Sequence, residues 1–247
     1  MNLTQDLNSP LDITFFVPCF NEERLIQSTL NHLREAIETT KLTYEIIVVD
    51  DCSHDNTSEK VREWQRGHPG IRLELVNNTK NRGLARSFVD TAFRGRGRYY
   101  RLLCGDDPET VPTLVRMFEQ IGKADMILPY YDYLPGKGVV RSQISSLYTK
   151  IINFISGYKI KYYNGCGIHL RYNVMRWGPY SFGFGFQAEL ITRLLDEGAS
   201  YYEIALEAQH HVKPPHQSAL NLGNLLSVGH TLLEMIVRRI RRDVFQR

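Results

Sequence analysis

The sequence lacks the features that are typical of membrane-spanning, secreted or nucleic-acid-binding chains. No apolar run approaches the ~20 residues that a membrane-spanning helix needs, and no secretory signal precedes the first apolar segment. The four cysteines form neither a Cys-x-x-Cys pair nor a short disulfide framework, which favours a reduced, cytoplasmic chain. A net charge of only +3 gives no reason to expect a nucleic-acid partner. Internal repeats and low-complexity segments are absent as well.

What remains is an ordinary globular composition, with 43% hydrophobic and 23% charged residues in 247. Strand-like and helix-like patterns alternate through the first half, which predicts an α/β fold with a mainly parallel sheet. We expect one domain over 1–247, divided into a ligand-binding half at 11–129, a second half at 130–219 and a helix at 220–247. The predicted strands are 12–18, 44–49, 71–76, 99–104, 125–128, 165–171 and 201–206.

The segment 44–57 carries the clearest functional signal. A run of mostly β-branched apolar residues, typical of a buried parallel strand, leads directly into Asp50 and Asp51. In open α/β sheets the ligand binds beyond the carboxyl ends of the strands, where these carboxylates stand. A single aspartate would suit a turn, whereas a pair followed by Ser53, His54 and Asp55 favours a binding edge. A similar polar turn follows the first strand, where Asn21 is expected to cap a helix.

Four segments, in this order, resemble the family-two glycosyltransferases of the GT-A fold. The resemblance is greatest to the branch of dolichol-phosphate mannosyltransferase and bacterial polyprenol-phosphate sugar transferases. It covers residues 13–128 well and the remainder loosely. The segments are Val-Pro-Cys-Phe-Asn-Glu-Glu at 17–23, Val-Val-Asp-Asp-Cys-Ser-His-Asp-Asn-Thr at 48–57, Asn-Arg-Gly-Leu-Ala-Arg-Ser at 81–87 and Gly-Asp-Asp-Pro at 105–108.

The resemblance implies an inverting transfer of a sugar from a nucleotide-diphospho-sugar, such as a UDP- or GDP-sugar. It implies that Val49 and Asp51 hold the base, a role that suits a carboxylate accepting an imide or amide N–H. Arg82 is a further candidate for contact with phosphate. The residues implied to cradle the nucleotide from the first strand are Pro18, Phe20 and Glu22.

The resemblance also implies Mg²⁺ or Mn²⁺ as cofactor, held against the diphosphate by an Asp-x-Asp motif at the end of the fourth strand. Here the motif reads Cys104-Gly105-Asp106, so its first carboxylate is missing. We expect Asp106 to bind both the metal and the nucleotide and to support catalysis, with Asp107 assisting. Cys104 is not assigned as a ligand, because a thiol is a poor partner for Mg²⁺.

The acceptor follows less directly from the resemblance, and we expect a lipid phosphate, with a glycan as the alternative. An ionised phosphate acceptor needs a cation, and Lys213 takes that catalytic role. A sugar or protein hydroxyl needs a general base, and Glu189 is the candidate. From a different class, the chain could be a catalytically lapsed nucleotide-binding protein, because the first motif carboxylate is absent.

The tail combines an apolar stripe with five arginines, at positions 238, 239, 241, 242 and 247. Such a helix is suited to an anionic membrane surface, where a lipid-linked acceptor would be found. The alternative is a helix that packs on the domain or on a second subunit, as in a homodimer. The first reading predicts a cytoplasmic protein at the inner face of the membrane.

Overall fold

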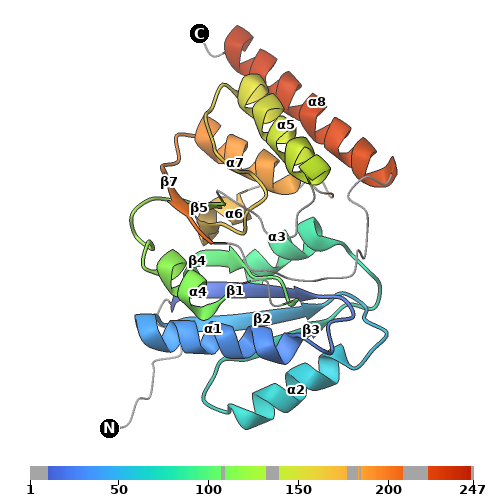
Figure 1. The fold of residues 1–247 in the computed structure, drawn as a ribbon, viewed down its shortest axis with the longest axis vertical. Coiled ribbons are helices and arrows are strands. Elements are labelled where there is room, and N and C mark those ends of the chain that lie inside the picture. Colours follow the sequence, from blue (N-terminus) through green and yellow to red (C-terminus); the bar gives the residue numbers. More distant parts are fainter. Residues whose placement is uncertain are drawn as a thin grey trace.

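The computed structural model describes residues 11–106, 109–131, 139–176, 183, 185–207 and 222–245. Within them a seven-stranded sheet in the order β3-β2-β1-β4-β6-β5-β7 has helices on both faces (Figure 1). The strands are β1 Leu11–Cys19, β2 Tyr44–Asp50, β3 Leu73–Asn77, β4 Gly97–Leu102, β5 Met126–Tyr130, β6 Ile168–Leu170 and β7 Tyr201–Ala205. The helices are α1 Ile26–Thr40, α2 Thr57–Gly67, α3 Leu84–Arg94, α4 Val111–Phe118, α5 Val139–Ser156, α6 Arg171–Met175, α7 Phe186–Asp196 and α8 Leu222–Phe245.

The sheet is mainly parallel, as the alternation of strands and helices predicted. Strands β3, β2, β1 and β4 run parallel, and β5 and β7 are parallel to each other. The short β6 is antiparallel to both β4 and β5 and joins the two halves. All seven predicted strands are present, and the predicted α/β fold is confirmed.

Side chains of β1 alternate between two apolar layers, one on each face of the sheet. Phe15 and Val17 pack in a cluster with α1, α2 and α4, while Phe16 packs in a second cluster with α3, α5, α6, α7 and α8. Burial on both faces explains the nearly continuous apolar sequence of this strand. The strand ends are thereby fixed, and their polar continuations lie together at one edge of the sheet.

The prediction that Asn21 caps the first helix is wrong. Helix α1 begins at Ile26, with Leu25 as its N-cap and no acidic residue in its first turn. Asn21 instead has φ 58°, a left-handed conformation that asparagine tolerates better than most residues, and it lies in the loop after β1. The acidic residues that follow it are therefore available to link loops.

A buried ion pair anchors the segment between β4 and α4. Arg101 on β4 is fully buried, and its Nη2 donates to Glu109 Oε1 at 2.6 Å and to Oε2 at 2.8 Å. Its Nε also donates to the carbonyl of Cys166 at 3.2 Å. Because an unpaired buried charge is very costly, this pair fixes residue 109 close to the sheet. The segment that contains Asp106 is thus held at both ends.

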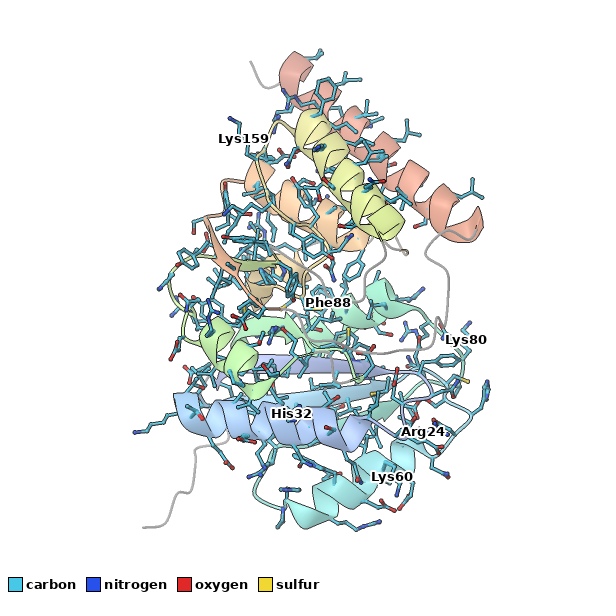
Figure 2. All side chains as sticks on the ribbon, in the orientation of Figure 1. Arg24, His32, Lys60, Lys80, Phe88 and Lys159 are labelled. Carbon is cyan, nitrogen blue, oxygen red and sulfur yellow. The ribbon has the colours of Figure 1, made fainter. Side chains whose placement is uncertain are left out.

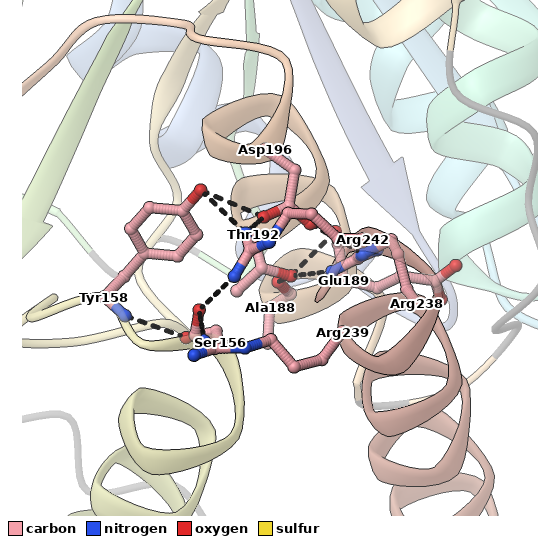
Figure 3. A network of polar contacts seen from close by, with 9 residues as sticks. All are labelled: Ser156, Tyr158, Ala188, Glu189, Thr192, Asp196, Arg238, Arg239 and Arg242. Carbon is pink, nitrogen blue, oxygen red and sulfur yellow. Dashed lines mark hydrogen bonds and ion pairs between the residues drawn. The ribbon is translucent and has the colours of Figure 1, made fainter. Parts of the chain in front are cut away.

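Helix α8 docks on the domain through three of its arginines, as in the alternative of a helix that packs on the domain. Arg238 Nε lies 2.9 Å from an Asp196 oxygen, Arg242 pairs with the same carboxylate, and Arg239 donates to the Ser156 carbonyl at 2.7 Å (Figure 3). These partners are the last residues of α7 and α5, where helix dipoles favour cations. The predicted arginine side of the tail therefore faces the domain.

The fold gives one prediction of pH dependence. His169 on β6 is buried, and burial lowers its pKa to about 4, whereas an unfolded chain has a histidine pKa of about 6.5. Between these values the unfolded state binds a proton that the folded state does not, so acid weakens the fold. We therefore expect His169 to lower the free energy of unfolding by about 2 kcal/mol when the pH falls from 7 to 5.

Urea titrations at the two pH values would measure this loss, with His169→Gln as the comparison. The variant should lose less stability than the wild type over the same interval. An equal loss in His169→Gln and the wild type would contradict the prediction.

Candidate functional site

The predicted binding edge is formed by strands that end in register. Cys19 of β1 pairs with Asp50 of β2, and Asp50 pairs with Asn77 of β3. The loop after β4 joins them, because Gly105 N–H donates to the Pro18 carbonyl at 3.2 Å. The continuations of four strands therefore meet at one edge, as expected for a ligand site of an open α/β sheet.

The loops after β1 and β2 are linked by reciprocal hydrogen bonds. Asn21 N–H donates to Ser53 Oγ at 2.9 Å, and His54 N–H donates back to Asn21 Oδ1 at 2.8 Å. Glu23 N–H donates to Asp55 Oδ2 at 3.1 Å, while Glu23 Oε2 accepts from Asn56. These side chains hold the two loops in one arrangement before any ligand arrives.

The electrostatics of this edge are acidic. Burial raises the pKa of the Asp55 carboxyl, but hydrogen bonds from Thr57 and Glu23 outweigh it, so the pKa lies below its ordinary value. Burial, followed by the charges of Asp50, Glu22 and Asp55, raises the pKa of the Cys19 thiol well above its usual range. The edge thus favours cations, and Cys19 is protonated.

Asp51 organises the loop that leads into α3. Its carboxylate accepts from Asn78 Nδ2 at 2.7 Å, from Arg82 N–H at 2.8 Å and from Gly83 N–H at 2.9 Å. Gly83 has φ 82°, a left-handed conformation in which a side chain would be strained. A carboxylate has about four acceptor positions, so one remains for a further donor such as a base N–H.

Asp51→Ala is expected to weaken nucleotide binding with or without a divalent metal. The substitution removes the proposed acceptor for the base and also leaves the two N–H groups of residues 82 and 83 without their partner. Calorimetric titration with UDP and GDP in EDTA and in Mn²⁺ would measure both affinities. The control Glu74→Ala removes a carboxylate of β3 that is 49% exposed and pairs with Arg94 on the surface, and it tests whether the loss of a negative charge alone matters.

The remaining residues that are predicted to bind the nucleotide differ in where they lie and in how exposed they are. Pro18 and Val49 lie opposite each other in the β1–β2 pairing, at the end of the sheet. Phe20 is 40% exposed, and its ring centroid lies 6.2 Å from that of His54, so it presents an open aromatic face beside the linked loops. Glu22 N–H donates to Thr57 Oγ1 at 2.8 Å, which places that residue in the same network.

Arg82 is already paired within the chain. Its Nη2 lies 2.7 Å from Asp90 Oδ2, and both side chains are partly exposed. A phosphate would have to compete with this carboxylate for the guanidinium. Two exposed cations that the sequence reading did not single out, Arg24 and Lys80, lie at the same end of the molecule (Figure 2).

Asp106 follows a turn that only glycine fits. A Cβ on Gly105 would lie 2.7 Å from Cys19 Sγ and 2.9 Å from the Pro18 carbonyl oxygen. Thr29 Oγ1 also donates to the Gly105 carbonyl at 3.1 Å, so the turn is held against β1 and α1. This contact places Asp106 at the acidic edge, next in sequence to the turn that is held against β1.

The donor groups at this edge fit a hard divalent cation that is shared with a ligand. Asp107 lies outside the described residues, and among those described no cluster of three His, Cys, Asp or Glu side chains could hold a metal alone. Mg²⁺ is commonly bound through one or two carboxylates together with substrate phosphates. Asp106 in an acidic environment matches that mode of binding.

Glu189, the candidate base, lies in the first turn of α7 and is only 2% exposed. Its Oε2 is buried without a hydrogen-bond partner in the structure. Figure 3 shows the residue on the side of α7 that faces α8, close to Thr192 and Arg238. Lys213, the candidate cation for an acceptor phosphate, lies outside the described residues.

No helix in the described parts of the chain is both long and apolar enough to cross a membrane. Contact of α8 with a membrane surface therefore stays a prediction, and so does the division of 1–247 into its parts. The inward orientation of Arg238, Arg239 and Arg242 removes part of the argument for an anionic surface.

Solved structures with the same architecture include two glycosyltransferases. Glucosyl-3-phosphoglycerate synthase from Mycobacterium tuberculosis, solved with Mn²⁺, UDP and phosphoglyceric acid, has a TM-score of 0.68 at 15% identity, covering 93% of this chain and 78% of that one. A mannosyltransferase from Pyrobaculum calidifontis, solved with GDP-Man and Mn²⁺, has a TM-score of 0.63 at 17% identity, covering 95% and 65%. At these identities the likeness shows a shared GT-A fold.

Relatives by sequence include transferases named for polyprenol phosphates. A dolichyl-phosphate beta-glucosyltransferase of Trichomonas vaginalis is 34% identical over 122 residues, covering 47% of this chain and 34% of the relative. The dodecaprenyl-phosphate galacturonate synthase of Rhizobium johnstonii is 28% identical over 173 residues, covering 68% and 49%. The chain thus spans about a third and about a half of these relatives.

The family profile of glycosyl transferase family 2 matches residues 14–177, which run from within β1 through β6 and include the whole of the edge described above. The sequence match and the GT-A architecture agree on the same residues. This chain therefore belongs to glycosyl transferase family 2.

Proposed function

We propose that this enzyme transfers a sugar from a UDP- or GDP-sugar to a polyprenol phosphate, with inversion at the anomeric carbon. The observation that carries the donor part is the edge formed by the loops after β1, β2 and β4, where Asp51 and Asp106 stand beside the exposed Phe20. The relatives named for dolichyl and dodecaprenyl phosphates support the acceptor part.

In this proposal the linked loops bind and orient the nucleotide. Phe20 offers an apolar face, Val49 lines the pocket for the base, and Asp51 accepts from a base N–H through its remaining lone pair. Asp106 would hold Mg²⁺ or Mn²⁺ against the diphosphate, and the metal, when bound, would offset the charge of the leaving group. The acceptor oxygen attacks the anomeric carbon from the side opposite the diphosphate.

The burial of Glu189 favours a phosphate over a hydroxyl acceptor. A general base must come within hydrogen-bond reach of the proton that it removes, and a carboxylate that is 2% exposed and turned to α8 is poorly placed for this. A phosphate acceptor brings its own ionised oxygen and needs a cation instead, the role that we assign to Lys213.

A hydroxyl acceptor, such as a glycan or a protein side chain, remains the second candidate. It is favoured by the buried Glu189 Oε2 that has no hydrogen-bond partner, because an unsatisfied carboxylate oxygen is costly unless it serves a ligand. A third candidate, a lapsed nucleotide-binding protein, is excluded by any measurable turnover or hydrolysis of a nucleotide sugar.

Two variants assayed with both acceptor types test the choice. With a polyprenyl phosphate, Lys213→Ala should cost about 1.5–3 kcal/mol of transition-state stabilisation, and Glu189→Gln should matter less. With a hydroxyl acceptor, Glu189→Gln should lower the rate by roughly 10²–10⁴. Initial rates with UDP- and GDP-sugars in Mn²⁺ give both values, and a dominant effect of Glu189→Gln would overturn the lipid-phosphate proposal.

If the acceptor is a polyprenol phosphate, the enzyme acts at the cytoplasmic face of a membrane. We propose this location as a consequence of the acceptor, and sedimentation with vesicles that contain polyprenyl phosphate would test it. Loss of sedimentation when the polyprenyl phosphate is omitted would identify the acceptor itself as the attraction.

A further inference from the structure

Helices α5 and α8 expose large apolar side chains to solvent. They lie side by side at the end of the molecule away from β3 (Figure 1). Phe154 on α5 is 89% exposed and Leu233 on α8 is 58% exposed. The remaining members of this apolar face are Ile144, Leu147 and Ile151 on α5 and Leu226, Ile236, Val237, Ile240 and Val244 on α8.

The spacing of these residues is that of a helix-packing seam. On α8 the exposed positions 226, 230, 233, 237, 240 and 244 alternate by four and three residues, with valine at two of them and leucine or isoleucine at three. On α5 the positions 144, 147, 151 and 154 follow the same alternation. Apolar residues at this heptad spacing are typical of helices that pack on other helices.

The two seams lie on neighbouring sides of the helix pair. At 100° per residue, the exposed apolar side chains of α5 lie on the same flank as Tyr148 and Ile155, which share an apolar cluster with Leu232 of α8. The exposed polar residues Ser146 and Lys150 lie at the outer border of the α5 strip, away from α8, with Lys150 one turn before Phe154. The apolar face therefore continues from one helix to the other.

The charges beside this face favour a protein over a bilayer as its partner. A helix that lies on an anionic membrane carries lysine and arginine along the border of its apolar face. Here Arg238, Arg239 and Arg242 are turned inward to Asp196 and Ser156 (Figure 3). Arg241 is exposed at one border of the α8 seam, and Glu234 lies one heptad before it at the same border.

We propose that a second copy of this chain covers the apolar face, so that α5 and α8 of two copies form a four-helix interface. The two α8 helices run antiparallel, because this arrangement places Glu234 of each copy next to Arg241 of the partner subunit. A parallel arrangement would leave both charges opposite apolar residues or glycine. The face comprises ten exposed large apolar side chains, four on α5 and six on α8, and a standard interface buries ~800 Å² on each partner.

Sedimentation velocity of the full chain at micromolar concentrations tests the proposal. We expect a species of twice 28.6 kDa for the wild type. Leu233→Asp should raise the dissociation constant by at least about 100-fold, the scale of a buried interface anchor, because each dimer would bury two unpaired carboxylates. The matched control is Phe93→Asp on α3, where the side chain is 59% exposed outside this face, and it should leave the dimer intact.

A charge exchange adds a test of the orientation. Glu234→Arg alone should weaken the dimer, and Glu234→Arg combined with Arg241→Glu should restore it. Circular dichroism and thermal melts confirm that each variant is folded. A monomeric wild type, or a dimeric Leu233→Asp, would overturn the proposal. A monomer that sediments with phosphatidylglycerol vesicles through Leu233 would identify a bilayer as the partner instead. The outcome does not depend on the nucleotide sugar or the acceptor.

Discussion

Glu109→Ala is expected to destabilise the protein by about 3–5 kcal/mol, the cost of leaving a buried charge without its partner. Arg101 is fully buried on β4, and Glu109 is the carboxylate that lies within 2.8 Å of its guanidinium. Its remaining contacts, a carbonyl and the ring of Phe118 at 5.5 Å, do not neutralise the charge. Guanidinium denaturation monitored by tryptophan fluorescence would measure the loss.

The matched control is Glu38→Ala, which removes the partner of Arg34 in a surface pair of α1. That side chain is 61% exposed, so its loss should cost only about 0.3–0.5 kcal/mol. The double variant Arg101→Met with Glu109→Leu removes both charges and should recover most of the stability. Similar losses for Glu109→Ala and Glu38→Ala would contradict the assignment of Arg101–Glu109 as the anchor of this segment.

The fold could be predicted because each strand is buried on both faces. The alternating burial of Phe15, Phe16 and Val17 in β1 requires a continuous apolar run, which is a local and readable signal. Even the three-residue β6 was recognisable, from its position between glycines and a helix. Strand boundaries shifted by up to three residues, as at the start of β6, and at Asp50 a polar side chain extends the strand by one residue.

The positions of the candidate ligands were also readable, because the ends of parallel strands share one edge. Which atoms these side chains contact was not readable. Asp51 accepts hydrogen bonds from the N–H groups of residues 82 and 83, which lie more than thirty positions along the chain. Arg82 pairs with Asp90 of α3. Neither contact follows from the local sequence pattern. Arg101 is a charged residue within an apolar strand, and such a residue is a sequence signal for a buried partner, which here is Glu109.

The orientation of α8 depended on its neighbours. Its sequence has an apolar side and a basic side, and periodicity alone does not say which side faces the domain. Asp196 and the carbonyl of Ser156, at the ends of two other helices, attract the arginines inward. The apolar side is left exposed, which is the observation behind the proposed dimer.

Asp106→Asn is expected to lower the turnover of the nucleotide sugar by roughly 10²–10³, the usual cost of removing one group that stabilises a developing charge. The substitution keeps the size of the side chain and removes the charge that would hold Mg²⁺ or Mn²⁺ at the edge beside Gly105. The Asp106→Asn variant should therefore bind the nucleotide normally in EDTA, and it should lose the gain in affinity that Mn²⁺ gives the wild type.

Titration of UDP and GDP in EDTA and in Mn²⁺, together with initial rates, separates these effects. Glu74→Gln on β3 is the control, because it neutralises an exposed carboxylate that pairs with Arg94 on the surface. An equal loss of affinity in EDTA and in Mn²⁺ would assign Asp106 a structural role in the turn. A loss confined to Mn²⁺ would show that Asp106 is required to couple metal binding to the diphosphate, in a motif that has Cys104 in place of its first aspartate.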